Sequence, residues 1–157
     1  MMITNVEIYT DGGCRGNQKE NNIGAIGVVL KYGQHIKEYS QVYRNTTNNR
    51  MEIQAAITGL KHMKRFDIPV VIKSDSAYLV NCINNKWYES WLNNGWLTST
   101  RKPVENRDLW IELIDLMEKF NSISFVKVKG HSTDEGNNRA DELVNIAMDN
   151  VIKKHSI

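Results

Sequence analysis

Cysteine is scarce in this chain of 157 residues, which contains only Cys14 and Cys82. The two lie far apart in the sequence and match neither the spacing of a zinc site nor a disulfide framework. We therefore expect both to be reduced thiols.

Long apolar segments are also lacking, and the mean hydropathy is −0.47, which excludes a membrane-spanning helix. The first residues have no basic start and no extended apolar stretch, so we expect no secretory leader and a cytoplasmic location. The length fits a single domain over residues 1–157 with a substantial core.

A strong charge of either sign is absent too. The formal net charge of +2 does not by itself indicate nucleic acid. One stretch carries four cations against one acid, namely Lys31, Lys37, Arg44, Arg50 and Glu38. A solvated face and a stripe that follows phosphates explain this stretch equally well.

The stretch from Val6 to Gly13 predicts a strand that leads into an acid. Asp11 follows the alternating residues, and Gly12 and Gly13 would release the chain from the sheet. An Asp-Gly hairpin turn is the alternative, but the next apolar run begins only at about Ile23. We expect Asp11 at a strand tip, where a functional role depends on other carboxylates.

The remaining sequence predicts an α/β fold. Apolar or alternating runs predict strands over residues 24–30, 36–43, 70–72 and 123–128. Apolar residues at helical spacing predict helices between the strands at 36–43 and 70–72, between those at 70–72 and 123–128, and after the last strand. If the strand at 70–72 lies parallel to the first strand, the acids that follow both strands emerge at one sheet edge, where ligands bind.

Glu52 lies at the start of a helix and has two interpretations. With Asn49 it resembles a capping box, whose glutamate only bonds the backbone. It also shares a helical face with Ala56 and Gly59, whose small size would let this face approach the sheet closely.

Two more acids have structural and functional interpretations. Asp75 follows the strand at 70–72, where it is either the N-cap of a helix or a site residue. Asp141 shares a helical face with Val144 and Met148, which points it toward the protein body. A buried lone acid is costly, so Asp141 should have a cation partner.

Asp11, Glu52, Asp75 and Asp141 have no cluster of lysines or arginines beside them in the sequence. Four carboxylates at one edge repel one another unless divalent cations neutralise them, and oxygen ligands suit Mg²⁺ or Mn²⁺. Two such ions, about 3.5–4 Å apart, can hold the attacking water and the departing oxygen of a phosphodiester. The pattern therefore predicts nuclease chemistry.

Residues 86–107 contain three of the four tryptophans, Trp87, Trp91 and Trp96. Trp87 and Trp91 are four residues apart and would stack along one helical face. Core packing and contact with nucleic acid are both open for this segment.

Five motifs in order resemble type 1 ribonuclease H of the bacterial type. They are Tyr9-Thr10-Asp11-Gly12, Thr46-Thr47-Asn48-Asn49-Arg50-Met51-Glu52, Ser74-Asp75-Ser76, Lys102-Pro103-Val104-Glu105-Asn106-Arg107-Asp108-Leu109-Trp110, and Val128-Lys129-Gly130-His131 leading to Asn138-Arg139-Ala140-Asp141-Glu142-Leu143. The resemblance covers nearly the whole chain. It implies a ribonuclease-H-like fold, a five-stranded mixed sheet of order 3-2-1-4-5 with helices on both faces. We expect no separate hybrid-binding domain.

The resemblance also implies a metal-dependent endonuclease that cleaves the RNA strand of RNA/DNA hybrids and leaves 3′-hydroxyl and 5′-phosphate ends. Asp11, Glu52, Asp75 and Asp141 would hold two Mg²⁺ ions, with Mn²⁺ as a possible substitute. His131 would assist proton movement or product departure. The hybrid would be the partner of a monomer that needs no other protein and no membrane.

Substrate contacts follow from the same resemblance. Asn17, Asn48 and Asn49 match positions that meet the RNA from the minor groove, where 2′-hydroxyls distinguish RNA from DNA. Thr47 and Asn106 match a pocket that grips a phosphate of the DNA strand.

Residues 86–107, with Trp87, match the substrate handle of bacterial relatives, but three departures are present. The run from Trp91 to Trp96 is uncharged where relatives are strongly basic, so handle binding should be weaker and less salt-sensitive. Asn45 stands where many relatives have an arginine, and Ala77 stands where a glutamine often follows the acid.

Two other functions stay open. Transposases and integrases share this fold and cut or join DNA, although the Thr-Thr-Asn-Asn-Arg-Met-Glu block and the Lys-Gly-His loop argue against them. A non-catalytic hybrid-binding module is the second, and it is disfavoured because every acidic position is filled.

Overall fold

The computed structural model describes residues 5–16, 22–129 and 134–155. The elements in chain order are β1 (Val6–Arg15), β2 (Ile23–Tyr32), β3 (His35–Arg44), α1 (Asn48–Lys61), β4 (Val70–Ser74), α2 (Ala77–Asn84), α3 (Trp87–Asn94), α4 (Arg107–Met117), β5 (Ile123–Lys127) and α5 (Glu135–His155). The sheet order β3-β2-β1-β4-β5 confirms the predicted order. Strands β1 to β3 are antiparallel, and β4 and β5 run parallel to β1. None of the described helices is long and apolar enough to cross a membrane.

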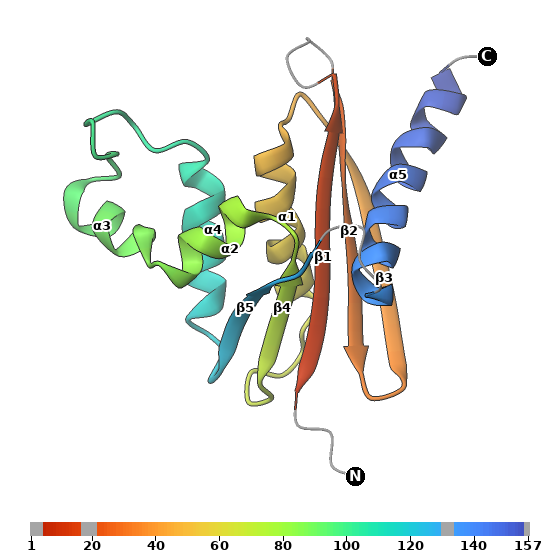
Figure 1. Cartoon of the computed structure of the whole chain (residues 1–157), viewed down its shortest axis with the longest axis horizontal. Helices are drawn as coiled ribbons and strands as arrows, with labels where there is room; N and C mark the ends of the chain where they lie inside the picture. Colours follow the sequence, from red (N-terminus) through yellow and green to blue (C-terminus); the bar gives the residue numbers. More distant parts are fainter. Residues whose placement is uncertain (1–4, 17–21, 130–133, 156–157) are drawn as a thin grey trace.

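Helices cover both faces of the sheet (Figure 1). On one face, α1 packs on β1 and β2, and α4 packs on α1. On the other face, α5 lies across β1, β2 and β3. The main apolar core lies on the α1 face, whereas α5 rests on two small clusters, made of Tyr9, Val29 and Ala140 and of Ala25, Val144 and Met148.

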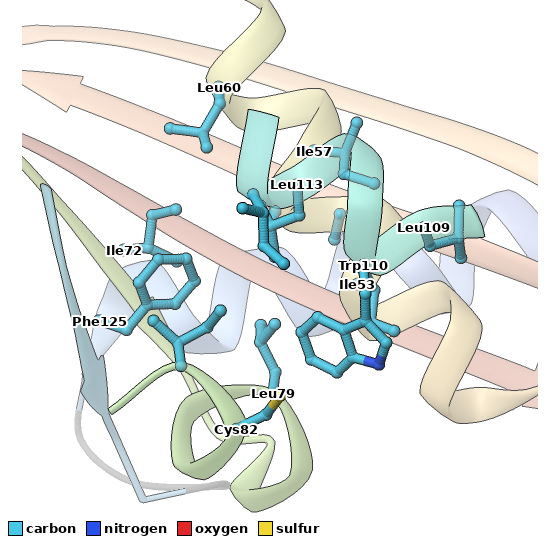
Figure 2. Close-up of a cluster of buried hydrophobic side chains, with 14 of the residues drawn as sticks. Ile53, Ile57, Leu60, Ile72, Leu79, Cys82, Leu109, Trp110, Leu113 and Phe125 are labelled. Carbon is cyan, nitrogen blue, oxygen red and sulfur yellow. The ribbon is translucent and has the colours of Figure 1, made fainter. Parts of the chain in front are cut away.

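Trp110 is the largest fully buried side chain of the main core. Its ring lies 5.4 Å from that of Tyr78 and 5.9 Å from that of Trp91. Figure 2 shows its indole among side chains of α1, α2 and α4. Leu109 and Leu113 of the same helix are also buried.

Strand β1 is longer than predicted. It continues past Asp11 to Arg15, and both Gly12 and Gly13 pair with β2. The parallel strand β4 pairs with β1 only as far as Thr10. Asp11 therefore lies within β1, at the point where its parallel neighbour ends, and the prediction of a strand tip was wrong.

Close packing, rather than release from the sheet, accounts for the glycine after Asp11. A Cβ on Gly12 would lie 2.4 Å from the carbonyl carbon of Met51 and 2.5 Å from the nitrogen of Glu52. Only glycine allows α1 to begin this close to β1. On the opposite face, a Cβ on Gly27 would lie 2.2 Å from the carbonyl oxygen of Ala140.

We expect Gly27→Ala to lower the free energy of unfolding by about 1–3 kcal/mol, because the methyl group overlaps α5. Urea denaturation followed by circular dichroism measures this change. Ser40→Ala is the control, since Ser40 is exposed and pairs with Gly27 from β3; its unfolding free energy should stay within about 0.5 kcal/mol of the parent's. Equal stability of Gly27→Ala and the parent would contradict close packing of α5.

Candidate active site

Three carboxylates from separate elements meet where β4 ends. Asp11 comes from β1, Glu52 from the first turns of α1, and Asp75 directly follows β4. One carboxylate oxygen of each residue lies within 4.8 Å of the other two. Asp11 and Glu52 are 7% and 8% exposed, and Asp75 is half-buried.

The start of α1 turns Glu52 toward the sheet. Thr47 is the N-cap residue, and its hydroxyl oxygen accepts a hydrogen bond from the backbone nitrogen of Arg50 at 3.1 Å. Glu52 Oε1 instead accepts a hydrogen bond from the backbone nitrogen of Gly12. The capping-box interpretation of Glu52 with Asn49 was therefore wrong, and the carboxylate is tied to β1.

Helix α2 is capped by Ser76, so the N-cap interpretation of Asp75 was wrong by one residue. The Ser76 hydroxyl oxygen accepts a hydrogen bond from the backbone nitrogen of Leu79 at 3.1 Å. The same side chain also hydrogen-bonds Glu52. Ser76 thus connects the start of α2 with the carboxylate that α1 supplies.

Asp141 of α5 lines the same cleft as the three acids. The cleft has a volume of about 430 Å³, and Val144 and Met148 line it beside Asp141, on the helical face predicted for them. In the part of the chain that the structure describes, no cationic side chain pairs with Asp141. Its neighbour is Asp11, so the cation partner expected for Asp141 stays a prediction that a bound metal ion would meet.

Burial and mutual repulsion keep protons on the inner carboxyls. Burial, followed by the charges of Glu52 and Asp75 and by the neighbouring Asp141, raises the pKa of Asp11 to about 9. Burial and then the charge of Asp75 raise the pKa of Glu52 to about 8, against the opposing hydrogen bond from Gly12. Bound cations would take over the role of these protons.

The donor set fits a divalent metal ion. The cluster offers only carboxylate oxygens, which hard cations such as Mg²⁺ and Mn²⁺ prefer. The oxygens already lie close together, and an ion would relieve their repulsion. Asp11, Glu52 and Asp75 could therefore hold a metal ion.

The predicted RNA-contacting residues lie partly at this cleft. Asn48 and Asn49 line it beside the acids, at the beginning of α1. Asn17 and His131, which were also predicted site residues, lie outside the described residues.

Arg50 connects the two residues of the predicted phosphate pocket. Its backbone nitrogen donates to Thr47, and its Nη1 donates to Asn106 Oδ1 at 3.3 Å. Asp108 receives two further hydrogen bonds from its guanidinium, at 3.0 and 2.7 Å. The amide nitrogen of Asn106 donates to the Tyr78 hydroxyl at 3.1 Å.

Sequence reasoning named Arg50 only as one cation of a charged stretch, and it gave no role to Tyr78. Arg50 also stood within one of the quoted motifs, and the motif and the charged stretch were the two signals that could have identified it. Its partner Asp108 is far away in the sequence, so no local periodicity connects them.

Trp87 and Trp91 line the same cavity, as expected for a shared helical face, but among the described residues their rings make no stacking contact. The Trp91 ring packs against Trp96 and Trp110, with centroids at 5.7 and 5.9 Å. Trp87 begins α3, is 44% exposed, and lines a second cavity of about 360 Å³ together with Tyr78. Packing therefore explains Trp91 and Trp96, whereas Trp87 is open to a ligand.

The RNase H family model matches residues 4–149 of the chain. The ribonuclease H of Clostridium botulinum is 51% identical over 144 residues, which cover 92% of this chain and 95% of that protein. The chain belongs to the ribonuclease H family. This membership confirms the family and the enzyme class predicted from the motifs.

Solved structures of ribonucleases H share the fold. LC9-RNase H1, a type 1 RNase H with the type 2 active-site motif, has a TM-score of 0.76 and 27% identity, over 96% of this chain and 74% of that one. LC11-RNase H1 in complex with an RNA/DNA hybrid has a TM-score of 0.71 and 28% identity, over 94% of this chain and 99% of that one. The ribonuclease-H-like fold is thereby confirmed.

The raised pKa values predict a pH dependence for the metal-free protein. The folded state binds more protons than the unfolded state between about pH 4 and pH 9, so its stability falls as pH rises through this range. Asp11→Asn should remove part of this loss and stabilise the metal-free protein at about pH 8 by at least about 1.4 kcal/mol, the equivalent of one pKa unit.

Urea unfolding in EDTA at about pH 5.5 and pH 8 measures this effect. Asp115→Asn, on the exposed side of α4, is the matched control and should show the parent's pH dependence. If the metal-free parent were equally stable at both pH values, the carboxylates would not repel one another as the structure implies.

Proposed function

We propose that this ribonuclease H hydrolyses the RNA strand of RNA/DNA hybrids internally with two Mg²⁺ ions, leaving 3′-hydroxyl and 5′-phosphate ends. The observation that supports this most is the cluster of carboxylates in an open cleft of a chain from this family. The related LC11-RNase H1, which has been solved with an RNA/DNA hybrid, supports the choice of substrate.

Asp11, Glu52 and Asp75 would hold the ions, with Asp141 beside Asp11 completing the cleft. Bound ions would activate a water molecule and stabilise the departing oxygen of the phosphodiester. The protein fixes the carboxylates beforehand, since Gly12 and Ser76 hydrogen-bond Glu52. His131 keeps the role in proton movement or product departure that the sequence resemblance gives it.

Selection of a hybrid would depend on side chains around the cleft. Asn48 and Asn49 line it and carry amides that can bond 2′-hydroxyls in the minor groove, as Asn17 would by resemblance. Thr47 and Asn106, held together by Arg50, would bind a phosphate of the DNA strand.

Residues 1–157 would form one ribonuclease H domain, with residues 86–107 as the substrate handle. In support, a single continuous sheet carries the packing of the helices on both faces. A monomeric state and a cytoplasmic location stay predictions from the sequence.

The direct test uses Mg²⁺ and end-labelled RNA/DNA, DNA/DNA and RNA/RNA duplexes. We expect cleavage of the RNA strand of the hybrid alone. Asp11→Asn should lower kcat by more than about 100-fold, beyond the loss typical of residues outside the metal's direct ligands, while Asp115→Asn retains activity. Cleavage of the DNA duplex would favour a transposase-like or integrase-like enzyme, and binding of the hybrid without any cleavage would favour a binding module.

The uncharged handle predicts a shallow dependence of KM on salt. Asn93 is exposed on α3, whereas the neighbouring Asn94 side chain hydrogen-bonds the backbone of Leu97 and should be left intact. Asn93→Lys should steepen the slope of log KM against log salt by about 0.7 to 0.9 for one added phosphate contact. Asn93→Gln is the neutral control, and equal slopes for the two variants would place the handle away from the substrate.

A further inference from the structure

Arg15 is the single cation among the described residues that line the acidic cleft. The wall of the cleft includes the carboxylates of Asp11, Glu52, Asp75 and Asp141, and Arg15 is the last residue of β1. Its side chain is 36% exposed. A fixed positive charge at the edge of an acidic cleft attracts a phosphate backbone that the carboxylates would otherwise repel.

Helix α5 holds the Arg15 guanidinium in place. Nη1 donates to Asp149 Oδ1 at 2.6 Å, and Nη2 donates to Asn145 Oδ1 at 3.3 Å. The guanidinium has five N–H donors, so three stay available after these two contacts. A planar fork that is already oriented suits a phosphate group better than a mobile side chain does.

The same contacts reach one of the cleft acids. Asn145, which receives a hydrogen bond from Arg15, donates its amide to the carbonyl oxygen of Asp141 at 3.1 Å. The end of β1, the guanidinium and this turn of α5 therefore form one connected unit beside the carboxylates.

We propose that Arg15 binds a backbone phosphate of the strand that is cut, to one side of the scissile bond. Arg15 lies four residues after Asp11 along β1, about 13 Å at the rise of a strand, so its charge stands beside the metal-binding acids and not among them. This rests on the proposed function, because the strand that enters the acidic cleft is then RNA.

A purely structural role would use the same ion pair, and Asp149 separates the two. Asp149→Ala removes the bridge to α5 and leaves the guanidinium, whereas Arg15→Met removes both. The Asp149 side chain is 58% exposed and does not line the cleft. Its loss makes the potential around Arg15 more positive, and Asn145 still holds Nη2, so a phosphate contact would be kept.

Steady-state cleavage of a labelled hybrid at several salt concentrations tests the proposal. We expect Arg15→Met to raise KM about tenfold, as for loss of one charge-assisted hydrogen bond, with kcat within about twofold of the parent's. It should also reduce the slope of log KM against log salt by about 0.7 to 0.9. Arg15→Lys should keep the slope, and Asp149→Ala should keep the slope without raising KM.

Two outcomes would overturn a phosphate contact: Asp149→Ala raising KM as much as Arg15→Met, or Arg15→Met behaving as the parent. The melting temperatures of Arg15→Met and Asp149→Ala measure how much the Arg15–Asp149 ion pair stabilises the fold, and both should fall equally. An inactive parent would instead overturn the proposed function itself, before any variant is compared.

A second measurement identifies the strand. Methylphosphonates, which are neutral, replace the phosphates one at a time in the RNA strand and then in the DNA strand. One replacement in the RNA strand should raise the parent's KM and leave that of Arg15→Met unchanged. If that replacement lies in the DNA strand, the assignment to the cut strand is wrong.

Discussion

Repulsion between carboxylates is the constraint on which this structure depends. Asp11, Glu52 and Asp75 hold their oxygens within 4.8 Å of one another, and an arrangement of this kind persists only on a rigid support. The paired strands β1 and β4 supply this support. The hydrogen bond from the Gly12 nitrogen to Glu52 attaches α1 to β1. If the support were more flexible, the carboxylates would move apart, and the site would bind cations less tightly.

The close approach of α1 and α5 to the two faces of the sheet brings their acids to the same cleft as the residues of β1. Gly12 lets α1 come near from one face, and Gly27 of the neighbouring strand lets α5 come near from the other. Asp11 and Arg15 lie on the same strand, so the acids and the cation of the cleft share one support. Small residues at these positions thus determine the shape of the site as much as the charged residues do.

The strand order and the meeting of the four acids in one cleft were predictable, because periodicity and the family resemblance indicate both. The length of β1 was not, since Gly12 and Gly13 read locally as a turn, and only the packing of α1 shows why glycine is needed within the strand. The caps of α1 and α2 were misplaced by one or two residues, because several adjacent residues can cap. Arg15 escaped notice because its partners lie on α5, more than a hundred residues away.

The unequal size of the two cores has a consequence for local unfolding. Helix α5 carries Asp141 and holds Arg15, yet the apolar contacts that its described residues make with the sheet form only two small clusters, beside the surface ion pairs of Arg15 with Asp149 and of Arg139 with Glu38. Detaching α5 exposes less apolar surface than opening the α1 face, so this sub-global opening costs less free energy than global unfolding. Amide hydrogens of α5 should exchange ahead of those of α1, and the enzyme would lose its fourth carboxylate before it loses its fold.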